Sequence, residues 1–335
     1  MSKFPQYSIE KLSSTCFRNY ITHIPVVKKC NYEIVEGFTI AGDAPKKFIR
    51  LYDNEYNHTF FKKNKKKWPL YIAKTGHKWY PIESITEYLL NQLGEAFGLR
   101  MAKSSLRIIG NQVRFLSRYF LKGRTDELIH GAEIFAGYIG DREFIEAIET
   151  EALARDFFTL QFVEKSVVTL FPYQKDEIMH DFVKMLLFDA LVGNNDRHFY
   201  NWGIIHSITN SYQPYFSPIY DTARGLFWND DDDKLANRFQ NNRDSYILKY
   251  CKNSKPKIGW EGESNINHFK LVSHIFNNEF YISKSDIREL FNASLLEQMY
   301  SIIDNRFCVL MSIQRVEMIK LCLQYRYNQI IKLLV

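Results

Sequence analysis

One short polar segment of the chain combines side chains that could carry out phosphoryl transfer. Residues 193–201 read GNNDRHFYN, and Asn201 stands five positions after Asp196. Enzymes that transfer the γ-phosphate of ATP use Asp and Asn at this spacing, because Asp accepts the proton of the attacking hydroxyl and Asn binds Mg²⁺. The segment therefore predicts a catalytic loop, and a polar turn without chemistry is the alternative.

A second carboxylate stands at the end of a nearby apolar stretch. Asp221 follows residues 215–220, which read YFSPIY, and lies twenty positions after Asn201. Mg²⁺ is usually held by one or two carboxylates together with phosphate oxygens. Asp221 is therefore predicted to be a metal ligand, and the alternative is that it caps the element that follows.

A lysine and a glutamate upstream have the spacing of a nucleotide site. Lys74 ends the apolar stretch 70–74, and Glu87 lies in the first turns of a segment with helical periodicity, 83–97. Kinases place a strand lysine on the α- and β-phosphates and orient it with a helix carboxylate. The alternative is an ordinary lysine at the surface.

A turn precedes this lysine strand. Residues 39–46 read TIAGDAPK, so Gly42 lies within a turn between two predicted strands and Lys46 follows it. Backbone N–H groups of such a turn can hold phosphates, whereas a plain hairpin turn is the alternative. The four features occur in the order phosphate loop, lysine strand, glutamate helix and Asp/Asn/Asp loop, which chance would rarely produce.

Hydrophobic periodicity indicates the elements that must position these residues. Alternating and apolar stretches predict strands over residues 34–40, 48–52, 70–74, 105–109, 113–120, 202–206 and 215–220. Spacing of three to four residues predicts helices over 83–97, 133–139, 141–164, 175–191 and from 287 to the end. The order predicts a β-rich lobe and a helical lobe, joined near residues 118–123, with a ligand cleft between them.

Composition places the chain among soluble globular proteins. Hydrophobic residues make up 46% and charged residues 24%, and the net charge of +6 is small for a dedicated nucleic-acid binder. The five cysteines are odd in number and form no C-x-x-C pair, which argues against a disulfide framework or a structural zinc site. No apolar run reaches the length of a membrane span, and residues 1–21 lack a signal-peptide pattern.

Taken together, these motifs resemble those of the HipA-like serine/threonine kinases of bacteria. The resemblance is carried by the loop 193–201, by residues 219–221 (IYD), by 71–74 (YIAK), by 86–88 (TEY) and by 39–46. It spans roughly residues 37–226, and the pattern Gly-Asn-x-Asp-Arg-His-x-x-Asn is its specific part.

The resemblance implies a fold and a division of the chain. The fold is α+β and protein-kinase-like, with a β-rich N-lobe that contains one helix and a mostly α-helical C-lobe. The expected bounds are an N-terminal appendage at 1–30, the N-lobe at 31–120 and the C-lobe at 121–335.

The resemblance also implies roles for the central residues. Asp196 is expected to be the catalytic base, with Asn201 and Asp221 holding Mg²⁺. Lys74 is expected to contact the α- and β-phosphates of ATP, with Glu87 as its partner.

Further nucleotide contacts follow from the same resemblance. The phosphate loop would contain Thr39, Gly42 and Lys46, with Thr39 as a site of autophosphorylation. The backbone near residues 117–119, from Ser117 to Tyr119, would line the adenine pocket. His198 would order the catalytic loop, together with Arg197.

The resemblance implies an ATP- and Mg²⁺-dependent serine/threonine protein kinase that acts on a cytosolic protein. The expected context is the toxin of a toxin–antitoxin pair, with a cognate antitoxin as partner, or a translocated effector. The expected location is accordingly the bacterial cytoplasm, or a host cell reached without a cleaved signal. Neither end shows a helix-turn-helix pattern, so no autonomous DNA binding is expected.

Two other functions compete with this one. A phosphoinositide-type lipid kinase shares the Asp-Arg-His-x-x-Asn loop but needs a basic segment near its metal aspartate, and here residues 229–233 read NDDDD. A nucleotide-binding pseudokinase is disfavoured by the complete Lys/Glu/Asp/Asn/Asp set. The acidic run Asp230 to Asp233 and the lysine-rich run 62–67 are each predicted to be solvated loops.

Overall fold

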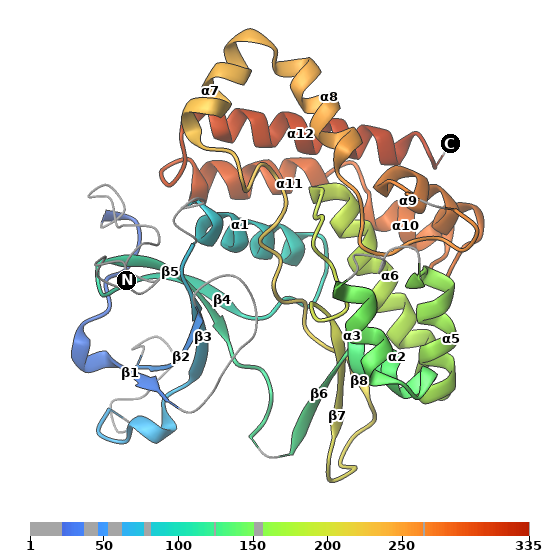
Figure 1. Ribbon diagram of the computed structural model, residues 1–335. Coiled ribbons are helices and arrows are strands. Elements are labelled where there is room, and N and C mark those ends of the chain that lie inside the picture. Colours follow the sequence, from blue (N-terminus) through green and yellow to red (C-terminus); the bar gives the residue numbers. More distant parts are fainter. Residues whose placement is uncertain are drawn as a thin grey trace, which may run out of the picture.

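The chain folds into a sheet-rich region followed by a largely helical region (Figure 1). The computed structural model describes residues 22–36, 46–52, 62–76, 82–123, 125–150, 157–263 and 265–334. The predicted α+β architecture, β-rich first and helical afterwards, is confirmed.

An antiparallel sheet of five strands forms the first region in the described residues, in the order β1-β2-β3-β5-β4. Its strands are β1 (Tyr32–Val35), β2 (Lys46–Leu51), β3 (Leu70–Lys74), β4 (Ser104–Ile109) and β5 (Gln112–Arg118). The register pairs Lys46 with Lys74 and Ile72 with Ser117. Since directly paired residues project to the same side of a sheet, Lys46, Lys74 and Ser117 share one face.

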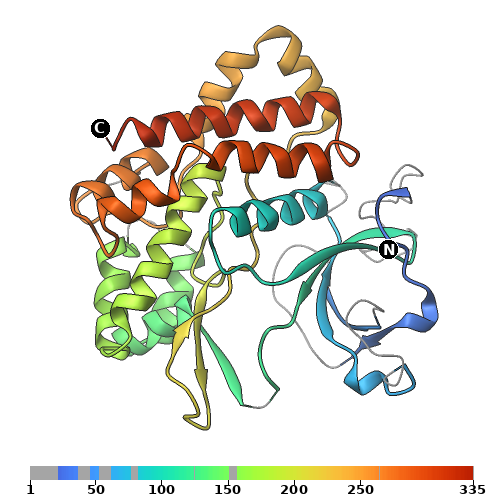
Figure 2. The same cartoon turned by 180° about the vertical axis from the view of Figure 1, so that it is seen from behind.

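Helix α1 (Glu83–Ala96) connects the sheet to the helical region. It packs on β4 and β5 and, on its other side, on α11 (Leu295–Ile302), as the view from behind shows (Figure 2). Ile85, Leu89 and Leu93 are buried along this helix. The predicted helix and its stop are as expected, because Gly98 has a positive φ of +82° just beyond the helix end.

The helical region is built around α6 (Lys175–Val192), whose second half is almost wholly buried. The long final helix α12 (Ile313–Ile331) packs against α6, α7, α8 and α9. The other α-helices in the described residues are α2 (Gly131–Ile139), α3 (Arg142–Thr150), α5 (Leu160–Leu170), α7 (Asp232–Asn241), α8 (Arg243–Asn253), α9 (His268–Asn277) and α10 (Lys284–Leu290).

A second antiparallel sheet supports the loop after α6. It consists of β6 (Asp126–His130), β7 (Gly203–Ser207) and β8 (Tyr215–Phe216), in that order. Sequence periodicity missed β6, in which charged and polar residues outnumber apolar ones. The predicted strand 215–220 is shorter than expected, since Pro218 cannot donate a hydrogen bond to a neighbouring strand.

The prediction of one helix over 141–164 is wrong. The described residues form two helices, α3 and α5, and Thr159 between them has extended backbone angles. The Thr159 hydroxyl accepts a hydrogen bond from the Phe162 N–H at 3.2 Å, so Thr159 begins α5 as its N-cap. The hydrophobic periodicity of residues 141–164 therefore does not mark one helix, because the polar side chain of Thr159 begins a new helix within it.

Three residues of the acidic run 230–233 are exposed, as expected, but the run is not a free turn because it begins α7. Asp231 is the N-cap of α7 and accepts the Lys234 N–H, while Asp230 is buried. Asp232 forms an ion pair at 2.6 Å with Arg315, which is itself buried on α12. The acidic run therefore fixes α7 to α12.

The lysine-rich run 62–67 is exposed between β2 and β3, as expected. No helix in the described part of the chain is long and apolar enough to cross a membrane.

Candidate active site

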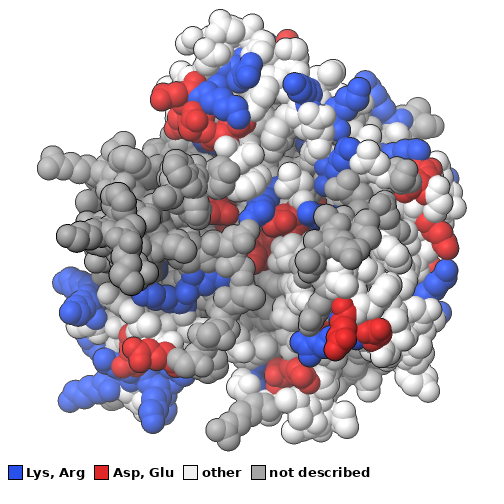
Figure 3. Space-filling model, viewed as in Figure 1, with Lys and Arg blue, Asp and Glu red and all other residues white. Residues whose placement is uncertain are grey.

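Two lysines and two carboxylates form a compact cluster where the sheet meets the helical region. The Lys74 Nζ lies 2.6 Å from Glu87 Oε1 and 2.7 Å from Asp221 Oδ1. The Lys46 Nζ lies 3.2 Å from the other oxygen of Asp221, Oδ2. Figure 3 shows acidic and basic side chains side by side near the centre of this face, between the two regions.

Strand pairing explains why both lysines reach Asp221. Lys46 and Lys74 are directly opposite each other on β2 and β3, and like charges in this position repel. Asp221 offsets the repulsion because each of its carboxylate oxygens accepts one ammonium group. The sheet therefore presents two cations at one point, which suits the binding of a polyphosphate.

The charges of the cluster shift the pKa values of its members. Burial raises the pKa of Asp221, but the ammonium groups of Lys74 and Lys46 outweigh this effect and hold the pKa well below its usual range. Burial raises the pKa of Glu87 to about 7, against the opposing charge of Lys74. For Lys74, burial is outweighed by Asp221 and Glu87, so its pKa lies above its ordinary value. At neutral pH, Lys74 and Asp221 are therefore both charged.

A fully buried arginine ties Asp221 to the predicted catalytic loop. The Arg197 Nη1 donates to the carbonyl oxygens of Asn201 and Tyr220, both at 2.9 Å, and Nη2 donates to Thr222 Oγ1 at 3.3 Å. These bonds hold the residues on either side of Asp221, whose own backbone has a positive φ of +52°. Such a conformation is costly for a residue with a side chain and needs surrounding contacts to maintain it.

Asp189 on α6 is the counter-ion of this arginine. Its two carboxylate oxygens accept from Arg197 Nε at 2.8 Å and Nη2 at 3.0 Å, and Oδ1 also accepts from Asn194 Nδ2 at 2.8 Å. Helix α6 ends one turn later at Gly193, whose positive φ of +69° and proximity to Arg326 both favour glycine. The rigid end of α6 thus sets the start of the loop.

Asp196 and Asn201 lie within one hydrogen-bonded turn. The Asp196 carbonyl accepts from Asn201 Nδ2 and from the His198 N–H, each at 2.8 Å. Because Nδ2 is engaged in this bond, Oδ1 is the Asn201 atom that could ligate a metal ion. The Asp196 carboxylate lies 3.2 Å from the Arg224 Nε, in the segment after Asp221.

The other residues predicted to contact the nucleotide lie on the first sheet and in the catalytic loop. Ser117 is buried on the same face of the sheet as Lys74, and the Tyr119 N–H donates to the Leu70 carbonyl at 2.8 Å. The Tyr119 ring lies edge-on to Phe48, with ring centroids 5.7 Å apart. The His198 ring accepts the Tyr200 N–H at 3.3 Å, so it contributes to the loop. Thr39 and Gly42 lie outside the described residues.

Sequence reasoning missed Asp189 and Arg224 as parts of this site. Asp189 interrupts the apolar run MLLFDALV at the end of α6, and a carboxylate in such a run needs a buried cation as partner. Arg197, eight positions later, was the available partner, so this contact had a signal in the sequence. Arg224 had none, because its contact depends on how the segment after Asp221 folds.

The donor set of the site fits Mg²⁺ with ATP. The described residues contain no group of three or more His, Cys, Asp or Glu that could hold a metal ion by itself. Mg²⁺ typically needs only one or two protein oxygens when phosphates supply others, and the Asp221 carboxylate and the Asn201 amide oxygen are of the required type. Lys46 and Lys74 add positive charge of the kind that phosphates require.

A strand lysine bound to a helix glutamate, next to an Asp/Asn loop and a third carboxylate, defines a protein-kinase-like site. Residues 38–293 match the family described as the HipA-like C-terminal domain. This match covers more than half of the chain, so the protein belongs to the HipA-like kinase family.

Two solved structures are similar to this chain. The Helicobacter pylori proinflammatory kinase CtkA has a TM-score of 0.68 and 19% identity, with 90% of this chain and 94% of that chain covered. HipA of Shewanella oneidensis MR-1, solved with HipB and its operator DNA, has a TM-score of 0.49 and 13% identity, with 89% and 64% covered. At 19% identity, the likeness to CtkA establishes the kinase fold. No curated protein sequence matches the chain.

Proposed function

We propose that this protein is an ATP- and Mg²⁺-dependent serine/threonine protein kinase. The observation that carries the proposal is the set of contacts from Glu87 through Lys74 to Asp221. Arg197, in the loop of Asp196, donates to the carbonyl of Tyr220 directly before Asp221. Membership in the HipA-like family supports the same conclusion.

The cluster in the sheet region would bind and orient the triphosphate. Lys74 would contact the α- and β-phosphates, and Glu87 would hold the lysine in place from α1. Lys46 would contribute a second cation from the same face of the sheet. The Mg²⁺ ion, when bound by Asp221 and Asn201, supplies neutralisation of the charge that builds up on the transferred phosphoryl group.

The loop after α6 would act on the acceptor. Asp196 would accept the proton of the substrate hydroxyl. The oxygen of that hydroxyl would attack the γ-phosphorus in line with the departing ADP oxygen. Arg224, paired with Asp196, would fix the orientation of that carboxylate. Fixed geometry and preorganised charge supply most of the rate in phosphoryl transfer, which agrees with the buried Arg197–Asp189 support.

The proposal extends to arrangement and context. The N-lobe would comprise residues 31–120 and the C-lobe 121–335, with 1–30 as an appendage. The adenine ring would lie near Ser117 and Tyr119, and Thr39 would be autophosphorylated. The kinase would act as a toxin with a cognate antitoxin, or as an effector delivered into a host cell.

Incubation with radiolabelled ATP and Mg²⁺, with and without a cell lysate, tests the activity. Wild type should label itself or a lysate protein, and Asp196→Ala and Asp221→Ala should abolish the label. Asp181→Ala, an exposed carboxylate on α6, is the matched control and should label like wild type. Label on phosphoinositide vesicles instead of protein would replace the proposal with a lipid kinase.

Context and autophosphorylation need separate tests. Inducible expression in a bacterium should arrest growth for wild type and not for Asp196→Ala if the protein is a toxin. Unimpaired growth with wild type would favour the effector role. Mass spectrometry after incubation with ATP should find phosphate on Thr39, and an unmodified Thr39 in active protein would reject that part of the proposal.

A further inference from the structure

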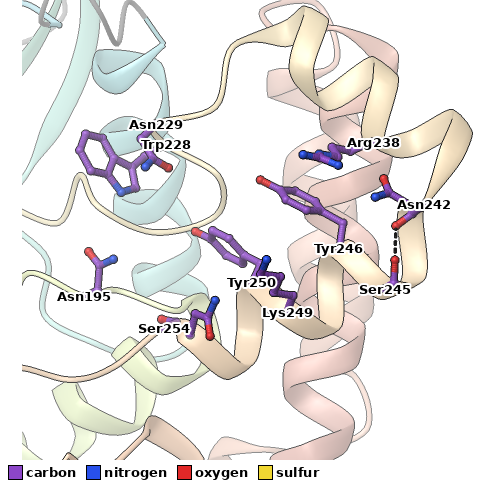
Figure 4. Close-up of a pocket in the computed structure, with 11 residues that line it drawn as sticks. Asn195, Trp228, Asn229, Arg238, Asn242, Ser245, Tyr246, Lys249, Tyr250 and Ser254 are labelled. Carbon is purple, nitrogen blue, oxygen red and sulfur yellow. Dashed lines mark hydrogen bonds between the residues drawn. The ribbon is translucent and has the colours of Figure 1, made fainter.

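A pocket of about 390 Å³ opens beside the catalytic loop, against α7 and α8 (Figure 4). Asn195, the neighbour of Asp196, and Trp228 line one side of it. Arg238 and Tyr246 line the opposite side, and Figure 4 shows the Tyr250 side chain between the two groups. The volume lies in the range of ligand pockets, about 300–1,000 Å³.

The charged residues that line the pocket are both basic. They are Arg238 on α7 and Lys249 on α8, and none of the lining residues is acidic. The Arg238 guanidinium lies over the Tyr246 ring, 5.3 Å from its centroid, which keeps the cation at the pocket wall. The nearby Asp230 carboxylate does not line the pocket; it pairs with Lys234 and accepts the hydroxyl of Tyr246 behind the pocket wall. The pocket therefore has positive character.

The walls of the pocket are fixed to the catalytic loop. The Tyr250 hydroxyl accepts the Phe227 N–H at 2.9 Å, and the Ser254 hydroxyl donates to the Gly193 carbonyl at 2.9 Å. On the other side, the guanidinium of Arg224 lies 4.9 Å from the centre of the Trp228 ring. The same Arg224 pairs with Asp196, so one side chain contacts both the pocket wall and the proposed base.

We propose that this pocket binds an anionic side chain of the protein substrate, close in sequence to the acceptor hydroxyl. This inference rests on the proposed kinase activity. Arginine and lysine bind carboxylates and phosphates, so the ligand is Asp, Glu or a phosphorylated residue, and the aromatic walls pack against the adjoining chain. The pocket is lined by Asn195, the neighbour of the proposed base Asp196, so its ligand and the acceptor hydroxyl bind close together. We therefore place the anionic residue within about four positions of the acceptor, a stretch that spans at most about 14 Å when extended.

Nonapeptides with a central Ser or Thr test this specificity. Glu is placed singly at each of the four positions on either side, and a matched peptide carries Gln there. Wild type should phosphorylate the Glu peptide with a kcat/KM about ten-fold above that of the Gln peptide at one or two positions. Phosphoserine at the same positions shows whether a primed phosphate or a carboxylate is preferred.

Charge-removing variants assign the preference to the pocket. The double variant Arg238→Gln and Lys249→Gln should reduce the ratio of kcat/KM for the Glu and Gln peptides to about one. The matched control is Arg243→Gln with Lys252→Gln, which removes two exposed charges from α8 outside the pocket and should keep the ratio. A wild-type ratio near one at all positions, or a preference that survives the pocket variant, overturns the inference. The absence of any phosphate transfer by wild type, to peptides or to protein, overturns the proposed function instead.

A binding measurement does not depend on catalysis. Calorimetry should show the preferred Glu nonapeptide binding wild type about ten-fold more tightly than the Arg238→Gln/Lys249→Gln protein. Equal binding by both proteins overturns the inference. A pocket of cations and aromatic rings also suits single-stranded nucleic acid, so a ten-nucleotide oligothymidine is titrated in parallel. Binding of the oligonucleotide but not of the peptide, lost in the same variant, overturns the peptide site.

Discussion

Removal of the buried counter-ion of Arg197 should destabilise the protein strongly and disable its catalytic loop. Asp189 and Arg197 are each about 1% exposed, and their side chains meet at 2.8 and 3.0 Å. Breaking a buried ion pair by removing one partner costs about 3–5 kcal/mol, because the other charge remains buried without compensation. Asp189→Leu and Arg197→Met should therefore each lose about 3–5 kcal/mol of unfolding free energy in urea denaturation, followed by tryptophan fluorescence.

The double variant separates stability from positioning. Two apolar side chains in place of a buried ion pair are often neutral for stability, so Asp189→Leu with Arg197→Met should regain most of the lost free energy. Its phosphoryl transfer should stay low, since no guanidinium then donates to the Asn201 and Tyr220 carbonyls. The exposed pair Arg243–Asp244 is the control, and its removal should leave the urea transition unchanged. Single variants that lose less than about 1 kcal/mol, or strictly additive losses, would refute this reasoning.

Three further predictions follow from the contacts described above. Because burial raises the pKa of Glu87 to about 7, a fall in pH protonates Glu87 in the free enzyme and weakens its hold on Lys74, so kcat/KM should fall between about pH 8 and 6; Glu87→Gln should be slow and should lack this acid limb. Arg315→Met should cost about 3 kcal/mol in urea unfolding, since it leaves the Phe227 and Asp230 carbonyls without their buried donor; a loss below about 1 kcal/mol would contradict the anchoring role. Gly131→Ala should cost about 1–3 kcal/mol, because the new Cβ would come within 2.4 Å of the Trp202 ring; thermal unfolding at an unchanged temperature would contradict that close packing.

Much of the fold was predictable because its signals are local. The strand 70–74, the helix that begins at Glu83 and the hairpin closed at residues 110–111 were all expected from periodicity and turn residues, and the structure contains them. The helix predicted over residues 175–191 is also present and ends one residue later, at Val192. These elements carry Lys74 and Glu87 and precede the loop of Asp196, so the element on which each of these residues lies could be predicted from the sequence.

What the sequence did not reveal depends on contacts between distant segments. The ion pair of Lys46 with Asp221 joins residues 175 positions apart and needs the register of β2 and β3. The role of the acidic run was missed because its partner, Arg315, lies 83 positions away on α12. Neither contact leaves a local pattern, since long-range pairing is decided by the packing of complete elements.

The pocket beside α8 was missed for a related reason. Residues 227–286 carry few strongly periodic stretches, and α7, α8 and α9 were not predicted. Helix α8 buries only Ile247 and Cys251 along its length, so its polar surface hides the apolar period. Its basic and aromatic residues form a pocket only in the folded protein, where α8 lies beside the catalytic loop.

Single-turnover transfer from γ-labelled ATP, measured beside Mg²⁺-ATP binding on the same proteins, tests directly whether Asp196 and Lys74 form a phosphoryl-transfer site. Asp196→Ala should bind Mg²⁺-ATP as tightly as wild type but transfer phosphate at least about 10²-fold more slowly. Lys74→Met should weaken binding and transfer together. Transfer at the wild-type rate by Asp196→Ala, or Mg²⁺-ATP binding that does not change in Lys74→Met, would contradict the assignment of this site.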